Sequence, residues 1–314
     1  TSKGKHMKIA AVIGNPPYQE MQGDEQLGFA SAIYPLFLNA AFEVEPRFVS
    51  MITPSRWLLK TGQGINEEWA DKLIRSDHFI SMCDYHDASE CFPGVEIKGG
   101  VVYFLYSAEY NGMCQYRNWI GNRRSDMRDR LDSFGCGVVV RDEIARSVLK
   151  KIISIEGENY VNDSFAKYVG PTHFFDKGGQ LGSSWKGFEL KKDEKHCIKY
   201  YLNKRVVDKG YAWIEKSDIP KGHEAIGLHK VYIPEAYGAG EGFPHQILGI
   251  PFYGEPNSVC SQTYLCIGYD PNVRKFTKAE CESVLSYVKT KFFRFLVLIK
   301  KNTQHAFSAV YQFV

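Results

Sequence analysis

The segment Asn15-Pro16-Pro17-Tyr18 carries the most specific chemical pattern in this 314-residue sequence. Its prolines stiffen the backbone and keep the residues before them out of the helical region. The side-chain oxygen of Asn15 and the carbonyl oxygen of Pro16 can each accept a hydrogen bond from an exocyclic amine, such as that of adenine. Two such acceptors favour a nucleophilic nitrogen through positioning and electrostatics alone. The pattern therefore suits methyl transfer to an amine nitrogen.

Tyr18 supplies a flat face beside these acceptors. An extruded base can stack on such a ring, which returns roughly 1–3 kcal/mol of the few kcal/mol that extrusion from a duplex costs. The structural alternative is a proline-stiffened turn whose tyrosine packs against the surface. Both interpretations stay open on these four residues alone.

The segment follows a predicted strand, residues 9–14, within an alternation of strands and helices. Apolar spacing and end signals predict helices over 29–42 and 66–75 (the latter capped by Asn66) and strands over 48–53, 79–85 and 101–107. This alternation indicates an α/β domain with a largely parallel sheet. In such sheets the working site lies beyond the carboxyl ends of the strands, where the Asn-Pro-Pro-Tyr segment is placed.

The second part of the chain has a different pattern. The arginine-rich stretch 118–133 is predicted to be a surface link, followed by a short strand over 137–141 and a helix over 142–153. Residues 160–267 are irregular, and a long helix is predicted from about 278 to 301, with Thr277 and Glu280 as a capping box. We therefore predict two domains, residues 1–135 and 136–314.

Composition is that of an ordinary globular protein, with 44% hydrophobic and 24% charged residues. Neither an apolar run of membrane-spanning length nor a signal peptide is evident, so no membrane partner is expected. The eight cysteines lack metal-ligand spacing, which indicates reduced thiols in a cytoplasmic protein and no metal site. Residues 1–150 hold 17 basic and 19 acidic side chains, against 22 and 17 in residues 151–314, a weak sign of a polyanionic partner.

Several stretches resemble the adenine-specific DNA methyltransferases of restriction–modification systems. "VIGNPPYQ", "IYPLFLNAAF", "MITPSRWLL" and "ECFPGVEIKGGVVYFLY" look like their catalytic half, whereas "VVVRDEIARSVLKKI", "CSQTYLCIGYD" and the C-terminal stretch look like their recognition domain. The resemblance implies a partial Rossmann-like methyltransferase sheet followed by an irregular α+β target-recognition domain. It implies methylation of a flipped adenine at N6.

The resemblance also assigns roles to residues. Asn15 and Pro16 would hold the adenine amine, Pro17 would stiffen the loop, and Tyr18 would stack on the base. Three further residues are expected around the base: Phe92 as a wall, Pro54 at the rim, and Lys98 near a backbone phosphate.

The implied cofactor is S-adenosylmethionine, but most of its site is missing from this sequence. The family places a glycine-containing loop after an earlier strand, and Ala10 stands where an aspartate is common. The chain thus resembles an excised piece, starting at the fourth strand, that is inactive by itself. The strand over 9–14 would then have an unpaired edge, which we expect the N-terminal residues or a second copy of the chain to cover.

Double-stranded DNA is the implied partner of the second domain. Phosphate contacts are predicted for Lys177, Lys186, Lys230, Lys300 and Lys301, and base contacts for Gln180, Gln246, Asn302 and Gln304. Two alternatives remain at this point. The chain could be a DNA-binding module without catalysis, or an enzyme with the same loop could act on a protein glutamine or an RNA guanine.

Overall fold

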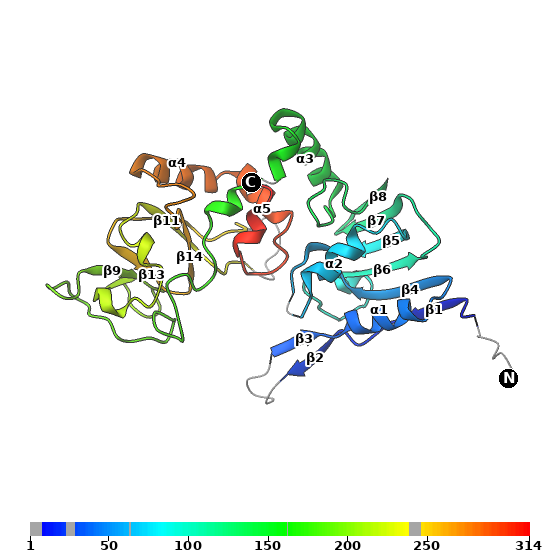
Figure 1. Ribbon diagram of the computed structural model, residues 1–314, viewed down its shortest axis with the longest axis horizontal. Coiled ribbons are helices and arrows are strands. Elements are labelled where there is room, and N and C mark those ends of the chain that lie inside the picture. The colour runs from blue at the N-terminus through cyan, green and yellow to red at the C-terminus, as the bar shows by residue number, and fades with distance from the viewer. Residues whose placement is uncertain (1–7, 23–28, 63, 162, 239–245) are drawn as a thin grey trace. The chain divides into compact units, whose positions relative to one another are not determined.

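The computed structural model describes residues 8–22, 29–62, 64–161, 163–238 and 246–314. The chain forms two compact units, Thr1–Ile155 and Glu156–Val314, so the predicted boundary at 135/136 lies some distance too early (Figure 1). The reason is that the segment after residue 135 packs on the first unit. Val139 donates its N–H to the carbonyl of Leu58, and Arg146 forms an ion pair with Asp129.

The first unit contains a six-stranded sheet in the order β1-β4-β6-β5-β7-β8. Its strands are β1 (Ala11–Gly14), β4 (Phe48–Pro54), β5 (Phe79–Tyr85), β6 (Val101–Tyr106), β7 (Cys114–Ile120) and β8 (Arg123–Asp129). The β1–β4 and β5–β7 pairs are parallel and the other three are antiparallel. The α/β class is confirmed, but a largely parallel sheet is wrong, because β6 and β8 run back against their neighbours.

The arginine-rich stretch is not a link. It forms the β7–β8 hairpin, which turns at Gly121, a residue with φ of 56°. Cys114, Tyr116 and Asn118 point into the protein while the arginines occupy exposed positions. Residues 137–141 are buried and make no strand, although the carbonyl of Arg141 accepts a hydrogen bond from Asn118.

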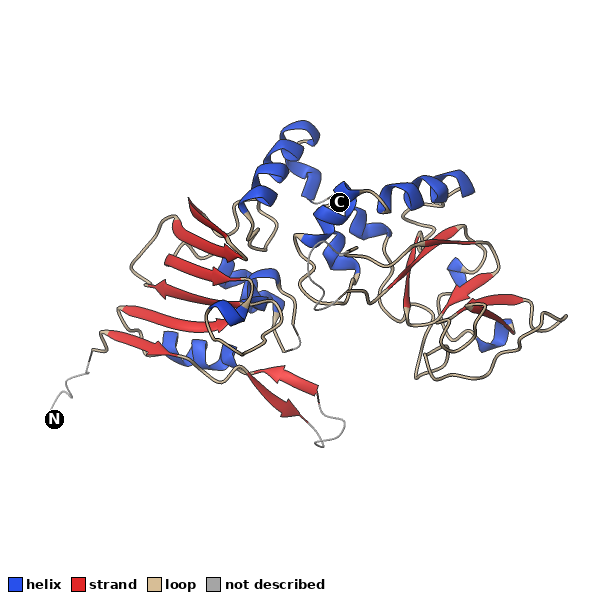
Figure 2. Ribbon diagram, turned by 180° about the vertical axis from the view of Figure 1, so that it is seen from behind, coloured by secondary structure: helices blue, strands red, loops and turns tan. Residues whose placement is uncertain are grey.

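Helices α1 (Tyr34–Glu43) and α2 (Glu67–Ile74) cover one face of this sheet, where Leu38 and Ala70 join a core containing Met82 and Phe104 (Figure 2). Helix α1 begins later than predicted. Phe29–Ala32 forms strand β3, paired with β2 (Gln19–Gln22), and Pro35 sits in the first turn of the helix. Asn66 caps α2 as predicted, accepting a hydrogen bond from the N–H of Trp69 at 2.9 Å. Helix α3 (Glu143–Glu156) runs to the boundary between the two units.

Strand β1 forms the edge of the sheet and pairs with β4 alone among the described strands. Ile13 on this strand is 80% exposed. The predicted cover by the first seven residues falls outside the described part of the chain. Self-association through this edge stays a prediction.

The second unit is built from two small sheets and two helices. The sheets have the orders β10-β9-β13 and β12-β11-β14. Their strands are β9 (Ile198–Tyr201), β10 (Tyr211–Ile214), β11 (Lys230–Pro234), β12 (Phe252–Gly254), β13 (Ser258–Cys260) and β14 (Tyr264–Ile267). The predicted long helix is two helices, α4 (Lys278–Val288) and α5 (Lys291–Leu298), because Thr290 interrupts the first and caps the second. The capping box of Thr277 and Glu280 is confirmed.

No helix in the described ranges is both long enough and apolar enough to cross a lipid bilayer.

Candidate functional site

The Asn-Pro-Pro-Tyr segment lies at the carboxyl end of β1. Because β1 and β4 are parallel, Pro54, the last residue of β4, lies at the same end of the sheet as this segment. Asn15 is exposed, and its carboxamide has no hydrogen-bond partner among the described residues, whereas Pro16 is buried. The carbonyl of Tyr18 accepts a hydrogen bond from the N–H of Ile33 at 3.2 Å. The amide of Asn15 is therefore free to bind a ligand.

A cavity of about 260 Å³ lies beside Tyr18. It is lined by Tyr18, Gln19, Ala32, Tyr34, Pro54, Arg56, Gly62, Ile65, Glu96, Ile97 and Lys98. The hydroxyls of Tyr18 and Tyr34 are buried without a hydrogen-bond partner. Burial raises the pKa of both phenols, so both are protonated donors at neutral pH. Both hydroxyl oxygens are inaccessible to solvent, so it is other atoms of these two residues that line the cavity.

The structure brings together some of the predicted site residues. Pro54 and Lys98 line the cavity with Tyr18, as the resemblance implied, but Phe92 does not. Phe92 is half-buried next to a short 3-10 helix, where its N–H bonds to the carbonyl of Ala88 at 2.7 Å. Asn15 and Pro16 adjoin the cavity through the chain without lining it.

Tyr34 and Arg56 line the cavity but were missing from the sequence-based set. Both lie inside the quoted stretches "IYPLFLNAAF" and "MITPSRWLL". Nothing local distinguishes them from other tyrosines and arginines, because their place in the cavity depends on how α1 and β4 pack.

The wall of the cavity that includes Lys98 is fixed by hydrogen bonds to the backbone carbonyl groups of residues 98–100. The carbonyl of Lys98 accepts from Nε of Arg56 at 2.8 Å, that of Gly99 from Nη1 of Arg141 at 2.9 Å, and that of Gly100 from the N–H of Ser55 at 3.0 Å. Gly100 has φ of 83°, and a Cβ there would lie 1.9 Å from the carbonyl oxygen of Tyr85. The wall therefore has a fixed backbone.

The Arg141 side chain is itself fixed by the buried carboxylate of Asp84. Nε and Nη2 of Arg141 each lie 2.6 Å from a different Asp84 oxygen. Ser55 and Tyr116 donate to the same carboxylate at 2.9 and 2.5 Å. Burial opposes ionisation of Asp84, but the charge of Arg141 and the hydrogen bonds from Arg141 and Tyr116 hold its pKa below the usual range. Because both partners are buried, the pair depends on complete mutual compensation.

His86 adds an acid-sensitive element to this network. Its Nε2 is buried, 3.5 Å from Asp84, and has no hydrogen-bond partner. Burial, together with the positive charge of Arg141, lowers the pKa of His86 to about 4. The ring is therefore neutral in the folded protein at pH 7.

We expect the first unit to lose stability as the pH falls from about 6.5 to 4. In this window the unfolded chain protonates His86, whose unfolded pKa is about 6.5, while the folded protein does not. The loss should approach about 1.4 kcal/mol per pH unit. Asp84 does not account for this loss of stability, because a depressed carboxyl pKa affects stability only near and below the pKa of the unfolded chain.

Urea unfolding at several pH values, read by hydrogen exchange of β5 peptides, measures how steeply the stability depends on pH. His86→Gln should make this dependence weaker. An equal slope in the variant would contradict this assignment.

In the second unit, three of the predicted phosphate contacts are wrong. Lys230 is fully buried, and its ammonium donates to the carbonyls of Ala225, Ile226 and Leu228 at 2.9, 3.2 and 2.8 Å. Burial lowers its pKa to about 8. Lys300 and Lys301 are mostly buried as well. Lys300 donates to Gln312, and Lys301 donates to the carbonyls of Tyr237 and Thr303.

The other predicted contacts are more accessible. Lys177, Lys186 and Gln304 are exposed and stay predictions, as does the half-buried Gln246. Gln180 is half-buried and donates to the carbonyl of Asp218 at 2.8 Å. The amide of Asn302 is buried without a partner, so it is not presented to a base edge. Within the described ranges, no group of three or more His, Cys, Asp or Glu side chains is arranged to hold a metal ion.

Comparison with known proteins adds family information for part of the chain. The Eco57I restriction-modification methylase family matches residues 2–92. An uncharacterized adenine-specific methylase of Mycoplasma pneumoniae is 36% identical over 107 residues, which cover 34% of this chain and 25% of that protein. The chain thus spans about a quarter of the length of this relative.

Two solved structures are similar over most of the chain. The type IIL restriction-modification enzyme MmeI in complex with DNA has a TM-score of 0.44 at 7% identity, covering 97% of this chain and 45% of its own. A DrdV–DNA complex has a TM-score of 0.42 at 11% identity, and the match covers 95% of this chain and 42% of the chain in that complex. The family match over residues 2–92 and the likeness to the adenine-specific methylase confirm the resemblance drawn from the sequence.

Proposed function

We propose that the first unit holds the amino group of a flipped adenine for methylation at N6 within a site-specific DNA methyltransferase. The methyl donor would be S-adenosylmethionine, and the second unit would bind the double-stranded DNA. One observation carries the proposal: the carboxamide of Asn15 is exposed and unpartnered at the carboxyl end of β1, beside a cavity walled by Tyr18.

The dimensions and chemistry of the cavity support this role. Its volume of about 260 Å³ lies just below the range of about 300–1,000 Å³ typical of small-molecule sites. That size suits a single base. The ring of Tyr18 would stack on the base. Asn15 and Pro16 would accept from the amine, which needs no covalent step and no strong base.

The methyl donor supplies an electrophilic carbon that the amine attacks. We assign none of the described residues to this cofactor.

The test is methyl transfer by the full-length protein to unmethylated plasmid DNA, with digestion of the product to nucleosides. When the methyl group of S-adenosylmethionine is labelled, we expect the label in N6-methyladenine. Label in a protein glutamine or in an RNA guanine would overturn the substrate assignment. Duplex binding without any transfer would show a DNA-binding module instead of an enzyme.

We expect Tyr18→Phe to retain methyl transfer within about threefold of wild type, because stacking requires the ring and the hydroxyl has no protein partner. Tyr18→Ala should lose roughly 10-fold or more, since about 1–3 kcal/mol of stacking is removed. Single-turnover rates on plasmid DNA measure both. A severe defect in Tyr18→Phe would contradict the stacking role.

A further inference from the structure

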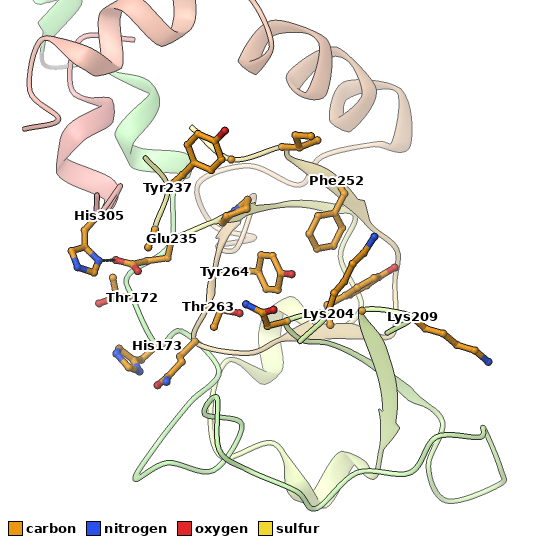
Figure 3. Close-up of a pocket in the computed structure, with 18 residues that line it drawn as sticks. Thr172, His173, Lys204, Lys209, Glu235, Tyr237, Phe252, Thr263, Tyr264 and His305 are labelled. Carbon is orange, nitrogen blue, oxygen red and sulfur yellow. Dashed lines mark hydrogen bonds and ion pairs between the residues drawn. The ribbon is translucent and has the colours of Figure 1, made fainter. Parts of the chain in front are cut away.

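A concavity with a volume of about 1,010 Å³ lies in the second unit (Figure 3). Several loops border it. They include the β9–β10 loop, which is closed by a hydrogen bond from the N–H of Leu202 to the carbonyl of Gly210, and the turn between β13 and β14. Loops on a rigid β scaffold are the usual carriers of binding residues. We call this concavity the loop groove.

Charge is unevenly distributed in the loop groove. Lys204 and Lys209 lie at one end, on the β9–β10 loop, and both are exposed (Figure 3). Neither forms an ion pair with any described carboxylate. The carboxylate of Glu235 lies at the other end and is paired with Nδ1 of His305 at 2.8 Å. The lysine end therefore presents two uncompensated positive charges.

Aromatic and polar side chains lie between the two ends. Phe252 and Tyr264 pack edge to face with their ring centroids 5.2 Å apart. Gln262, on the β13–β14 turn, also lines the groove, and its Nε2 donates to the hydroxyl of exposed Ser183 at 2.9 Å. No described group bonds to its Oε1, and water can replace the bond to Ser183. The amide of Gln262 is thus available to a ligand.

From these features we infer that the loop groove holds DNA, with Lys204 and Lys209 on backbone phosphates and Gln262 on a base edge. The inference rests on the proposed function, because it locates the DNA surface of the same protein. Unpaired lysines are the side chains that neutralise phosphates. A glutamine amide can bond bidentately to adenine in the major groove. The open, loop-lined shape of the groove favours a polymer over an enclosed metabolite.

The experiment measures binding of a mixed-sequence duplex to the full chain by fluorescence anisotropy between about 50 and 200 mM salt. Lys204→Ala/Lys209→Ala should weaken binding roughly tenfold and reduce the salt slope by about 2, because two phosphate contacts are lost. The matched control is Lys289→Ala/Lys291→Ala, which removes two exposed lysines of the same unit that lie outside the loop groove. The control should leave affinity and slope unchanged.

Gln262→Ala tests base reading. Duplexes selected from a randomised pool by wild-type protein should share a sequence motif. In the variant, the preference for one base over the others at one position of this motif should fall by about 10-fold. Unaltered selectivity at every position would overturn the role of Gln262. Equal loss of affinity in both lysine pairs, or none in either, would overturn the groove assignment.

The two proposals fail separately. If wild-type protein binds no duplex, the DNA part of the proposed function is wrong. If wild-type protein binds duplex but the Lys204/Lys209 variant binds equally well, the proposed function stands and DNA lies elsewhere. Circular dichroism of each variant checks that the fold is retained, and polyglutamate competing as well as DNA would overturn the phosphate assignment.

Discussion

Asn15→Ala is expected to reduce methyl transfer by about 10²–10³-fold or more, while the affinity for duplex DNA changes by less than about twofold. The carboxamide oxygen of Asn15 is one of the two acceptors proposed for the adenine amine. Without it, the nitrogen keeps its lone pair delocalised in the ring. Because this side chain is exposed and has no described protein partner, its removal should not disturb folding. Single-turnover methyl transfer and duplex anisotropy, both in the full-length protein, measure the two quantities.

Asn15→Asp is the matched variant, because it keeps an oxygen acceptor at the same position. It should retain measurably more activity than Asn15→Ala, although its charge alters the site. A parallel loss of activity and of duplex affinity in Asn15→Ala would instead indicate that the residue supports the fold. Equal activity of wild type and Asn15→Ala would refute the proposed holding of the amine.

Local signals in the sequence predicted the elements they control. The side chains of Asn66 and Thr277 cap helices at the predicted positions, because a cap is formed by residues within one turn. Strand β5 was predicted at its observed bounds, 79–85, since most of its residues are apolar and polar residues flank the run.

Elements that depend on distant partners were missed. Residues 118–133 looked like a link because they are polar, yet β7 pairs with β5, over 30 residues earlier in the chain. An edge hairpin with one exposed face tolerates many arginines. Similarly, Phe29–Ala32 has helical spacing but pairs with β2 instead.

The candidate site divides in the same way. Asn15 and Tyr18 lie in one contiguous motif at the end of a strand, and Pro54 ends the neighbouring strand, so their place near one end of the sheet was predictable. Lys98 precedes strand β6 and was placed near them by the resemblance. The burial of Lys230 was not predictable, because it depends on the pairing of β11 between β12 and β14, although the carbonyls around its ammonium come from residues shortly before it in the chain. A lysine in an apolar strand is the one signal that points to it.

The second large effect concerns the buried carboxylate behind the cavity wall. Asp84→Asn should destabilise the first unit by about 3–5 kcal/mol, because it leaves the buried guanidinium of Arg141 without its counter-charge. Arg141 also holds the carbonyl of Gly99, so the wall of the cavity should loosen in the same variant. Urea unfolding followed by hydrogen exchange of peptides from β4 to β7 measures the loss within this unit.

Asp71→Asn is the control for this variant, since Asp71 forms an ion pair with Lys60 but has a side chain that is 32% exposed. Partly exposed pairs contribute about 1 kcal/mol or less, so the two variants should differ by about 2 kcal/mol or more. If Asp84→Asn costs no more than Asp71→Asn, the Asp84–Arg141 pair does not hold the wall. The fixed backbone at residues 98–100 would then depend on Arg56 and Ser55 alone, and adenine binding should survive the loss of Asp84.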